Sequence, residues 1–248
     1  MTDRRHPMTC VTWNLHRTVG RDGRADPGRI TGAIASDIAA LQPQILALQE
    51  ADSDDVPPRA LLDLDAVCRA TGLRSQHADP DMRCGGTAHG CRGNILLLDP
   101  EMAPTSQFVL RLPGRYHRAA VVTEVLYRGA PMRIIACHLA LLQVLRVAQM
   151  RAIARALVPR PAMPTVLLGD LNEWRPWGGL ALHPRATSLP LTGPRARTFP
   201  VQAPLVALDR VLTCPALRVD RAVALDSPKI RAASDHRPLM AQITRLAA

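Results

Sequence analysis

The chain has 248 residues, enough to bury one substantial hydrophobic core, and no Pro/Gly/Ser-rich linker or charge block divides it. It is 47% hydrophobic but only 3% aromatic, and none of its apolar runs approaches the roughly 18 to 20 residues that span a bilayer. The net charge of +10 favours an anionic partner, although every basic residue except Lys229 is an arginine, as a GC-rich coding sequence alone would produce.

We therefore expect one domain over residues 1–248, in a monomeric protein, with a flexible N-terminus at residues 1–7. This terminus has no apolar segment of the kind found in export signals, which predicts a cytoplasmic protein with reduced thiols. One loop holds two histidines and two cysteines and raises the alternative of a structural zinc site. Its residues are His77, Cys84, His89 and Cys91. Their spacing matches none of the usual two-cysteine knuckles, which disfavours zinc.

The first fifty residues predict a strand, a helix and a second strand. Residues 8–14 are rich in β-branched side chains, and residues 45–48 form a short apolar run. Between them, apolar residues recur every three or four positions over 27–41, after an aspartate N-cap and a proline. Such a unit favours parallel strands, so Asn14 and Glu50 are expected at the same sheet edge.

The rest of the chain predicts mostly strands, with two helices. Helices are expected over 59–70 and 141–158, and strands over 94–98, 107–112, 119–127, 132–137, 165–168, 205–212, 218–225 and 238–243. The strands over 119–127 and 132–137 are expected to form a hairpin. The segments 74–93, 174–204 and the stretch before Ser234 are predicted to be loops.

Polar residues recur where these apolar strands begin or end. The strand from Thr165 stops at Gly169, and Asp170 and Asn172 follow two residues apart, so they can point into the same cleft. Each such residue, taken alone, can be a turn former or a cap. Together they occur in this order: Trp13-Asn14, Gln49-Glu50, His138-Leu139, Gly169-Asp170-Leu171-Asn172, Leu208-Asp209-Arg210-Val211 and Ser234-Asp235-His236.

This ordered set resembles the endonuclease/exonuclease/phosphatase superfamily of DNase I-like phosphoesterases, over almost the whole chain. Arg92-Gly93-Asn94 and Thr198-Phe199-Pro200 are similar to features of its small bacterial members. The resemblance implies an α/β fold, a four-layer sandwich of two mixed β-sheets packed face to face with helices on the outer faces. It also implies a hydrolase that needs Mg²⁺ or Mn²⁺, with Glu50 as metal ligand and Asn14 and Asp235 beside it.

The resemblance also implies the catalytic groups. His138 and Asn172 would hold the scissile phosphate, and Asp170 would position or deprotonate the attacking water. His236 would contact the phosphate or transfer a proton, held in orientation by Asp209. A histidine next to an aspartate favours its protonated form, which suits the negative charge that develops on phosphorus.

Contacts around this site are less specific in the sequence. Arg92, Asn94 and Trp174 are candidates for substrate binding, and Glu124 is a further candidate near the site. The family usually has an asparagine two residues before the first catalytic histidine, where this chain has Ala136. The carboxylate that would orient His138 cannot be identified from the sequence.

The substrate stays open at this level. A nuclease needs a basic surface, which loop arginines can supply, although few aromatic side chains are present to stack on bases. These arginines are Arg83, Arg92, Arg111, Arg115, Arg118 and Arg175. A phospholipid or other small phosphoester is the alternative, with Trp174 and Trp177 on a loop after Asn172. A non-catalytic binding protein on this fold is the remote alternative, because no catalytic group is missing.

Overall fold

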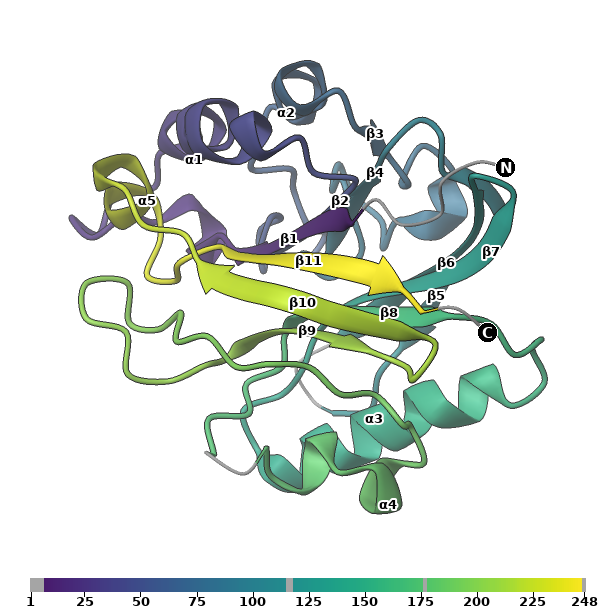
Figure 1. The fold of residues 1–248 in the computed structure, drawn as a ribbon. Helices are drawn as coiled ribbons and strands as arrows, with labels where there is room; N and C mark the ends of the chain where they lie inside the picture. The colour runs from purple at the N-terminus through teal and green to yellow at the C-terminus, as the bar shows by residue number, and fades with distance from the viewer. Residues whose placement is uncertain (1–6, 115–117, 176–177, 247–248) are drawn as a thin grey trace.

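Two β-sheets pack face to face in this computed structural model, which describes residues 7–114, 118–175 and 178–246 (Figure 1). Residues 1–6, including most of the expected flexible N-terminus, lie outside that description. In the described part, one sheet has six strands in the order β10-β11-β1-β2-β4-β3 and the other has five in the order β5-β6-β7-β8-β9. The β1–β2 and β7–β8 pairs are parallel and the other neighbours are antiparallel, so both sheets are mixed.

The strands of the first sheet are β1 (Met8–Asn14), β2 (Ile45–Gln49), β3 (Arg74–Ser75), β4 (Ile95–Leu98), β10 (Leu217–Ala224) and β11 (Leu239–Arg245). Those of the second are β5 (Ala103–Arg111), β6 (Ala119–Tyr127), β7 (Ala130–His138), β8 (Thr165–Asp170) and β9 (Asp209–Thr213). The helices are α1 (Pro27–Ala33), α2 (Leu64–Thr71), α3 (Gln143–Leu157), α4 (Pro184–Thr187) and α5 (Pro228–Ala233). Short 3₁₀ turns cover His16–Thr18, Pro80–Met82 and Leu180–Leu182.

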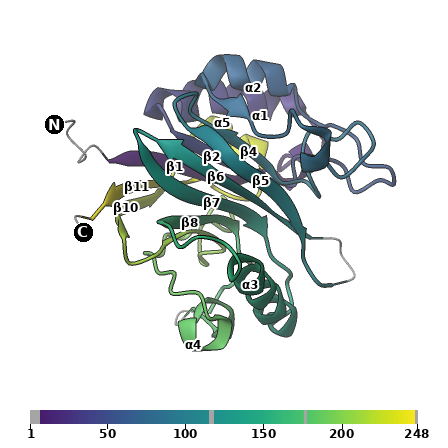
Figure 2. The same ribbon diagram turned by 90° about the vertical axis from the view of Figure 1, so that its right-hand side faces the viewer.

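The helices lie on the two outer faces. Helices α1, α2 and α5 cover the first sheet, and α3 and α4 cover the second (Figure 2). Successive strand residues point to opposite faces, so Leu168 packs between the sheets while its neighbour Leu167 packs in the cluster that includes α3. A third cluster joins the first sheet to its helices through residues such as Leu46 and Ile34. The predicted four-layer sandwich is confirmed.

Several predicted boundaries are wrong. The strand expected over 107–112 begins four residues earlier, at Ala103. The helix expected over 59–70 begins at Leu64, because the Asp63 side chain accepts a hydrogen bond from Ala66 N and fixes the start there. The strand expected over 205–212 begins at Asp209, because residue Val206 pairs with Phe199 in an isolated bridge instead of extending the sheet.

Other helical segments also differ from expectation, and one of them, α4, lies within residues 174–204, which were expected to be a loop. The helix predicted over 27–41 is helical throughout, but α1 continues as a π-helix over Ile34–Ile38 and a 3₁₀ turn over Ala39–Leu41. Helix α5 occupies a stretch expected to be a loop. Ser227 caps it by accepting from Ile230 N at 3.1 Å, and Pro228 occupies its first turn.

The histidine- and cysteine-bearing loop is not a zinc site. Cys84 and Cys91 form a disulfide, so the expectation of reduced thiols is wrong for this pair. His77 Nδ1 donates to Met82 O at 2.8 Å, and its Nε2 accepts from Leu96 N at 3.0 Å. His89 Nε2 contacts Leu62 O at 2.9 Å. Both ring nitrogens of His77 are therefore used to fix the loop to the edge of the first sheet.

We expect His77 to make the fold sensitive to acid. Burial lowers the pKa of His77 from 6.5 to about 4. A protonated Nε2 would also face the Leu96 N–H and lose its hydrogen bond. The neutral His77 stabilises the fold fully above pH 6.5. Between pH 6.5 and about 4 the unfolded chain takes up the proton and the folded chain does not, so this contribution to stability is lost as the pH falls. Over that pH window, the free energy of unfolding measured with urea should fall by up to about 3 kcal/mol more for wild type than for His77→Gln. Equal pH slopes for the two proteins would contradict this role.

Candidate active site

The predicted polar residues meet at one edge of the two sheets. On β7, β8 and β9 the register places His138 opposite Asp170, and Asp170 opposite Asp209. In the other sheet Asn14 ends β1 beside Gln49, and Glu50 follows. Strand pairing therefore brings together residues that are far apart in the sequence.

Asp170 lies at the centre of this group. Its Oδ2 accepts from Asn14 Nδ2 at 2.9 Å, and its Oδ1 accepts from Asn172 N at 2.9 Å. The same Oδ2 lies 3.4 Å from His138 Nε2 and 4.0 Å from His236 Nε2. The carboxylate is 2% exposed. Two imidazoles thus face one buried carboxylate oxygen.

The backbone around Asp170 is constrained by close packing. Gly169 has φ 144° and lies where β8 approaches β7, so that a Cβ atom there would collide with Cys137 O. Asn172 has φ 51°, an uncommon value for a residue other than glycine. Its Nδ2 donates to Leu139 O at 2.9 Å, which uses one of its two amide hydrogens and ties the loop after β8 to the loop after β7.

His138 is held in its neutral form. Arg118 Nη1 lies 2.7 Å from His138 Nδ1, and since a guanidinium can only donate, Nδ1 must accept. The remaining proton is then on Nε2, which faces Asp170. Burial, foremost, lowers the pKa of His138 to about 3. Glu50 Oε1 lies 4.0 Å from Nδ1, so Arg118 and not Glu50 makes the close contact at this nitrogen, while Asp170 faces Nε2.

The sequence signalled Arg118 only as one of several loop arginines. Burial lowers the pKa of its guanidinium, and the nearby charges of Glu50 and Asp170 oppose that shift. Arg118 precedes β6 and has no motif of its own, so only the pairing of β6 with β7 reveals its partner.

His236 forms a second buried pair. Its Nδ1 lies 2.9 Å from Asp209 Oδ2, which also accepts from Thr198 Oγ1 at 2.5 Å. Burial alone would lower the pKa of His236, but the charge and hydrogen bond of Asp209 outweigh it and raise the pKa to about 10. Phe199 packs on the ring with a centroid distance of 4.9 Å. The site therefore holds one neutral and one positively charged imidazole.

Glu50 lies at the open side of the site. It has φ 51°, and Gly93 packs against its backbone so closely that a Cβ atom at position 93 would lie 3.1 Å from Glu50 Cα. Arg17 Nη1 lies 2.8 Å from Glu50 Oε2 and 3.0 Å from Asp54 Oδ2. The side chain of Glu50 keeps 16% of its surface exposed.

Two sets of side chains are candidates for holding a cation. Glu50, Asn14 and Asp235 are oxygen donors at the ends of neighbouring strands, and the partly exposed carboxylates leave room for water, as Mg²⁺ requires. Asp170, Asp209 and His236 also place ligand atoms within 4.8 Å of one another. Atoms of both sets are engaged, since Asn14 Oδ1 accepts from His16 N at 3.0 Å and Arg17 pairs with Glu50. The greater exposure of Glu50 and Asp235 favours the first set for a hard cation.

The remaining candidates are placed differently. Asn94 is fully buried, and its Nδ2 donates to backbone carbonyls such as Ala119 O at 3.3 Å, so it shapes the loop that carries Gly93. Trp174 is 55% exposed beside the site loop, with the Arg175 guanidinium 4.9 Å from its ring centroid. Arg92 is half-buried and precedes Gly93. Ala136 packs between the two sheets.

Glu124 lies away from this edge. It pairs with Arg133 across β6 and β7, with Arg133 Nη2 2.7 Å from Glu124 Oε1. His138 is at the other end of β7, about 16 Å along the strand at the usual rise per residue. The suggestion that Glu124 contacts the site is therefore wrong.

Comparisons with known proteins agree with this fold. A family model described as Endonuclease/Exonuclease/phosphatase family matches residues 11–236. Uncharacterized protein YbhP of Escherichia coli strain K12 is 35% identical over 123 residues, 46% of this chain and 47% of YbhP, so the match spans about half of each protein.

Solved structures share the whole fold. The human Nocturnin catalytic domain with bound sulfate superposes with a TM-score of 0.71 at 20% identity, covering 97% of this chain and 94% of that one. Danio rerio TDP2 complexed with a single-strand DNA product has a TM-score of 0.69 at 13% identity, covering 96% and 99%. At these identities the likeness establishes the fold.

Proposed function

The chain belongs to the endonuclease/exonuclease/phosphatase family, and on that premise we propose that it is a divalent-metal-dependent hydrolase of phosphodiester bonds, with nucleic acid as its substrate. The strongest support for this proposal is the arrangement of four side chains at the edge of the two sheets. His138, Asp170 and Asp209 stand in register on three neighbouring strands, and His236 reaches over from the other sheet to contact both aspartates. This is a site for proton transfer and charge stabilisation at a phosphate.

Glu50, Asn14 and Asp235 would hold Mg²⁺ or Mn²⁺. A bound divalent cation supplies charge neutralisation and polarises a phosphoryl oxygen. These residues provide oxygen ligands at the open edge, beside the centre formed by Asp170 and the two imidazoles. Asp170 is then not needed as a metal ligand and can act on water.

The chain's own groups divide the remaining work. Asp170 orients the attacking water and accepts its proton, while Asn14 and Asn172 hold the carboxylate in place. Charged His236 stabilises the negative charge that develops on phosphorus. Neutral His138 offers its Nε2–H to a phosphoryl oxygen. Each such donor contributes about 10² to 10³ in rate in related chemistry.

Nucleic acid is favoured by the positive charge near the edge. Arg17, Arg118 and Arg175 lie on loops beside the site residues, and TDP2, which shares the fold, binds a single-strand DNA product. The phospholipid alternative is favoured by the exposed Trp174 and by Leu141 and Leu142, which are exposed on the loop after His138. Trp177 lies outside the described residues. In the described ranges, every helix is too short or too polar to cross a bilayer.

A side-by-side assay tests the proposal. Purified protein with Mg²⁺ or Mn²⁺ is incubated with plasmid DNA, an abasic-site duplex, RNA and mixed phospholipid vesicles, each repeated with EDTA and with Asp170→Ala. Cleavage of nucleic acid that vanishes in both controls supports the nuclease. If phosphate is released only from the lipid vesicles, the substrate is a phospholipid and not a nucleic acid. Lack of hydrolysis of all these substrates and of bis-p-nitrophenyl phosphate would leave the non-catalytic alternative.

Removing Arg17, the arginine that forms an ion pair with Glu50, should strengthen metal binding. Arg17 neutralises the carboxylate that would ligate the cation, and it adds a like charge beside that cation. We expect Arg17→Ala to lower the Kd for Mn²⁺ about fivefold, close to 1 kcal/mol for a partly exposed pair. Isothermal titration calorimetry measures this directly.

Arg59→Ala is the matched control, because Arg59 forms an exposed ion pair with Asp55 outside the site. Its Kd for Mn²⁺ should equal that of wild type. Weaker metal binding in Arg17→Ala than in Arg59→Ala would show that Arg17 supports the cation site instead of opposing it.

A further inference from the structure

A second concentration of positive charge lies on the outer side of β9. Asp209 and Arg210 are consecutive on this strand, so they point to opposite faces of the sheet. Asp209 faces His236, whereas Arg210 faces the layer that contains α3 and α4. Arg210 is 2% exposed, and its Nη2 donates to Glu173 O at 3.3 Å.

The guanidinium of Arg210 has no carboxylate of its own among the residues that the structure describes. Glu173, whose backbone carbonyl accepts from Arg210, is fully buried, and its carboxylate already accepts from Arg146 Nη2 at 3.2 Å and Arg175 Nη1 at 3.0 Å. The Nε of Arg210 is buried without a hydrogen-bond partner. A buried charge without a partner is costly, so this cluster has an excess of positive charge that an anion would balance.

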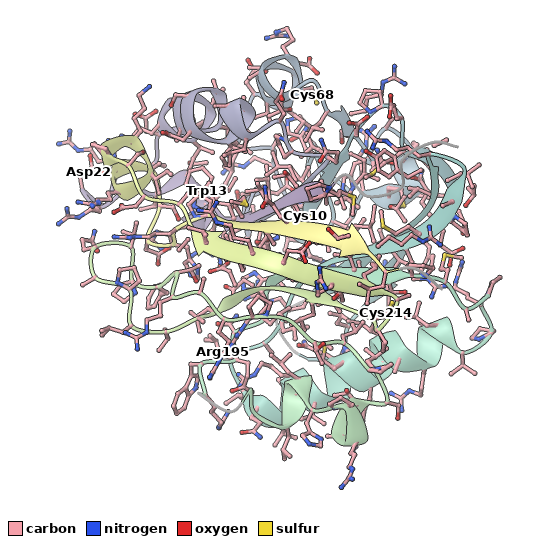
Figure 3. The ribbon with its side chains drawn as sticks, in the orientation of Figure 1. Cys10, Trp13, Asp22, Cys68, Arg195 and Cys214 are labelled. Atoms are coloured by element: carbon pink, nitrogen blue, oxygen red, sulfur yellow. A yellow bond between two sulfur atoms is a disulfide. The ribbon has the colours of Figure 1, made fainter. Side chains whose placement is uncertain are left out.

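A cavity of about 380 Å³ opens on this arginine. Arg195, an exposed residue on the loop that leads to β9, lines the same cavity, and Figure 3 shows it at the lower left of the molecule. Leu191 and Leu212 provide an apolar wall. Gly193 holds the loop against β9, where a Cβ atom would collide with Val211 O.

The titration of Arg210 agrees with this geometry. Burial lowers the pKa of Arg210 to about 10, and the charge of Arg195 acts in the same direction. Glu173 and Asp209 oppose that shift and do not offset it. Two guanidiniums that face one cavity without a shared acid are suited to an anion with several oxygens.

We propose that this cavity binds a phosphate group between Arg195 and Arg210, separately from the hydrolytic centre. The volume is large enough for the group that carries the phosphate. The phosphate has two possible sources, free inorganic phosphate or a further phosphate of a polyanionic substrate. The second source rests on the proposed function, whereas the first does not.

The binding test uses full-length Asp170→Ala protein with EDTA, so that neither hydrolysis nor metal contributes. Titration with inorganic phosphate, followed by calorimetry, should show one saturable site. Arg195→Ala and Arg210→Gln should each weaken it at least about tenfold. Arg185→Ala, which removes an exposed arginine from α4, should bind as the parent does.

Arg195→Ala keeps the proposal falsifiable if Arg210→Gln folds poorly, because Arg195 is exposed. Equal phosphate affinity in Arg195→Ala and Arg185→Ala would overturn the site. A phosphate site lost in His236→Ala but kept in Arg195→Ala would also overturn it, since the anion would then occupy the hydrolytic centre.

The source is decided with active enzyme. If a substrate phosphate occupies the cavity, Arg195→Ala should raise KM for a 5′-phosphorylated oligonucleotide and leave KM for bis-p-nitrophenyl phosphate unchanged. If free phosphate occupies it, neither KM should change, and the binding result above stands by itself. Failure of hydrolysis in every assay would remove the proposed function without affecting the phosphate titration.

Discussion

Replacing Asp170 by asparagine is expected to reduce kcat about 10³-fold or more with little change in the fold. The carboxylate lies between Asn14, Asn172 and both imidazoles, so it is the group placed to take a proton at the centre of the site. The amide keeps the shape of the side chain but cannot accept a proton. Loss of a positioned base typically costs 10² to 10⁴ in rate, and about 10³ is the middle of that range.

The measurement is steady-state hydrolysis of bis-p-nitrophenyl phosphate with Mg²⁺, together with urea unfolding. Glu124→Gln is the matched control, because Glu124 is also a buried strand carboxylate but pairs with Arg133 far from the site. We expect this control to lose about 3 kcal/mol of stability and to keep its kcat. Equal kcat in Asp170→Asn and wild type would show that Asp170 is not the catalytic base.

The strand ends could be predicted from the sequence, and with them most of the site. An apolar run that stops at Gly169 before Asp170, or at Cys137 before His138, is visible in one dimension. The parallel pairing of β1 with β2 followed from the intervening helix, and it correctly placed Asn14 near Glu50. Such local patterns carry information because each strand end exposes its polar residue at the same edge.

The orienting groups could not be predicted in this way. Arg118 reaches His138 across β6 and β7, and Arg17 reaches Glu50 from a turn with unusual backbone angles, at φ 50°. His77 belonged to a zinc alternative that the spacing disfavoured, and nothing in the sequence indicated that its two ring nitrogens bond to backbone groups. These roles depend on which loops pack together, and neither residue type nor spacing reports that.

The helix before Asp235 shows the same limit at the level of secondary structure. Helix α5 has only six residues, too few for a periodic pattern, and it is stabilised by the Ser227 cap and by burial of Ile230. It holds Ser234, whose Oγ donates to Asn14 O at 2.7 Å. Strands β1 and β11 are neighbours in the sheet, and this contact joins residues more than two hundred positions apart in the sequence. It fixes the positions of Asp235 and His236, which follow Ser234.

Replacing Asp209 by asparagine should lower kcat about 10²-fold at pH 7 and change its pH dependence. Burial alone lowers the pKa of His236, and Asp209 reverses this by accepting a hydrogen bond from Nδ1 at 2.9 Å. Without the negative charge, the imidazole should be neutral at pH 7 and unable to stabilise a phosphate transition state. The kcat of the variant should therefore rise as the pH falls below 6.5, a limb that wild type, with its pKa of about 10, lacks.

The same pair fixes the sign of a stability change. A raised histidine pKa stabilises the fold fully below pH 6.5, and this contribution is lost as the pH rises through about 10. The free energy of unfolding measured with urea should therefore fall more between pH 6 and pH 9.5 for wild type than for Asp209→Asn. Thr198→Val removes the other hydrogen bond to Asp209 but keeps its charge, so its kcat should keep the wild-type pH profile. An acid-rising limb in Thr198→Val as strong as in Asp209→Asn would mean that the hydrogen-bonded geometry of Asp209, and not its charge, keeps His236 protonated.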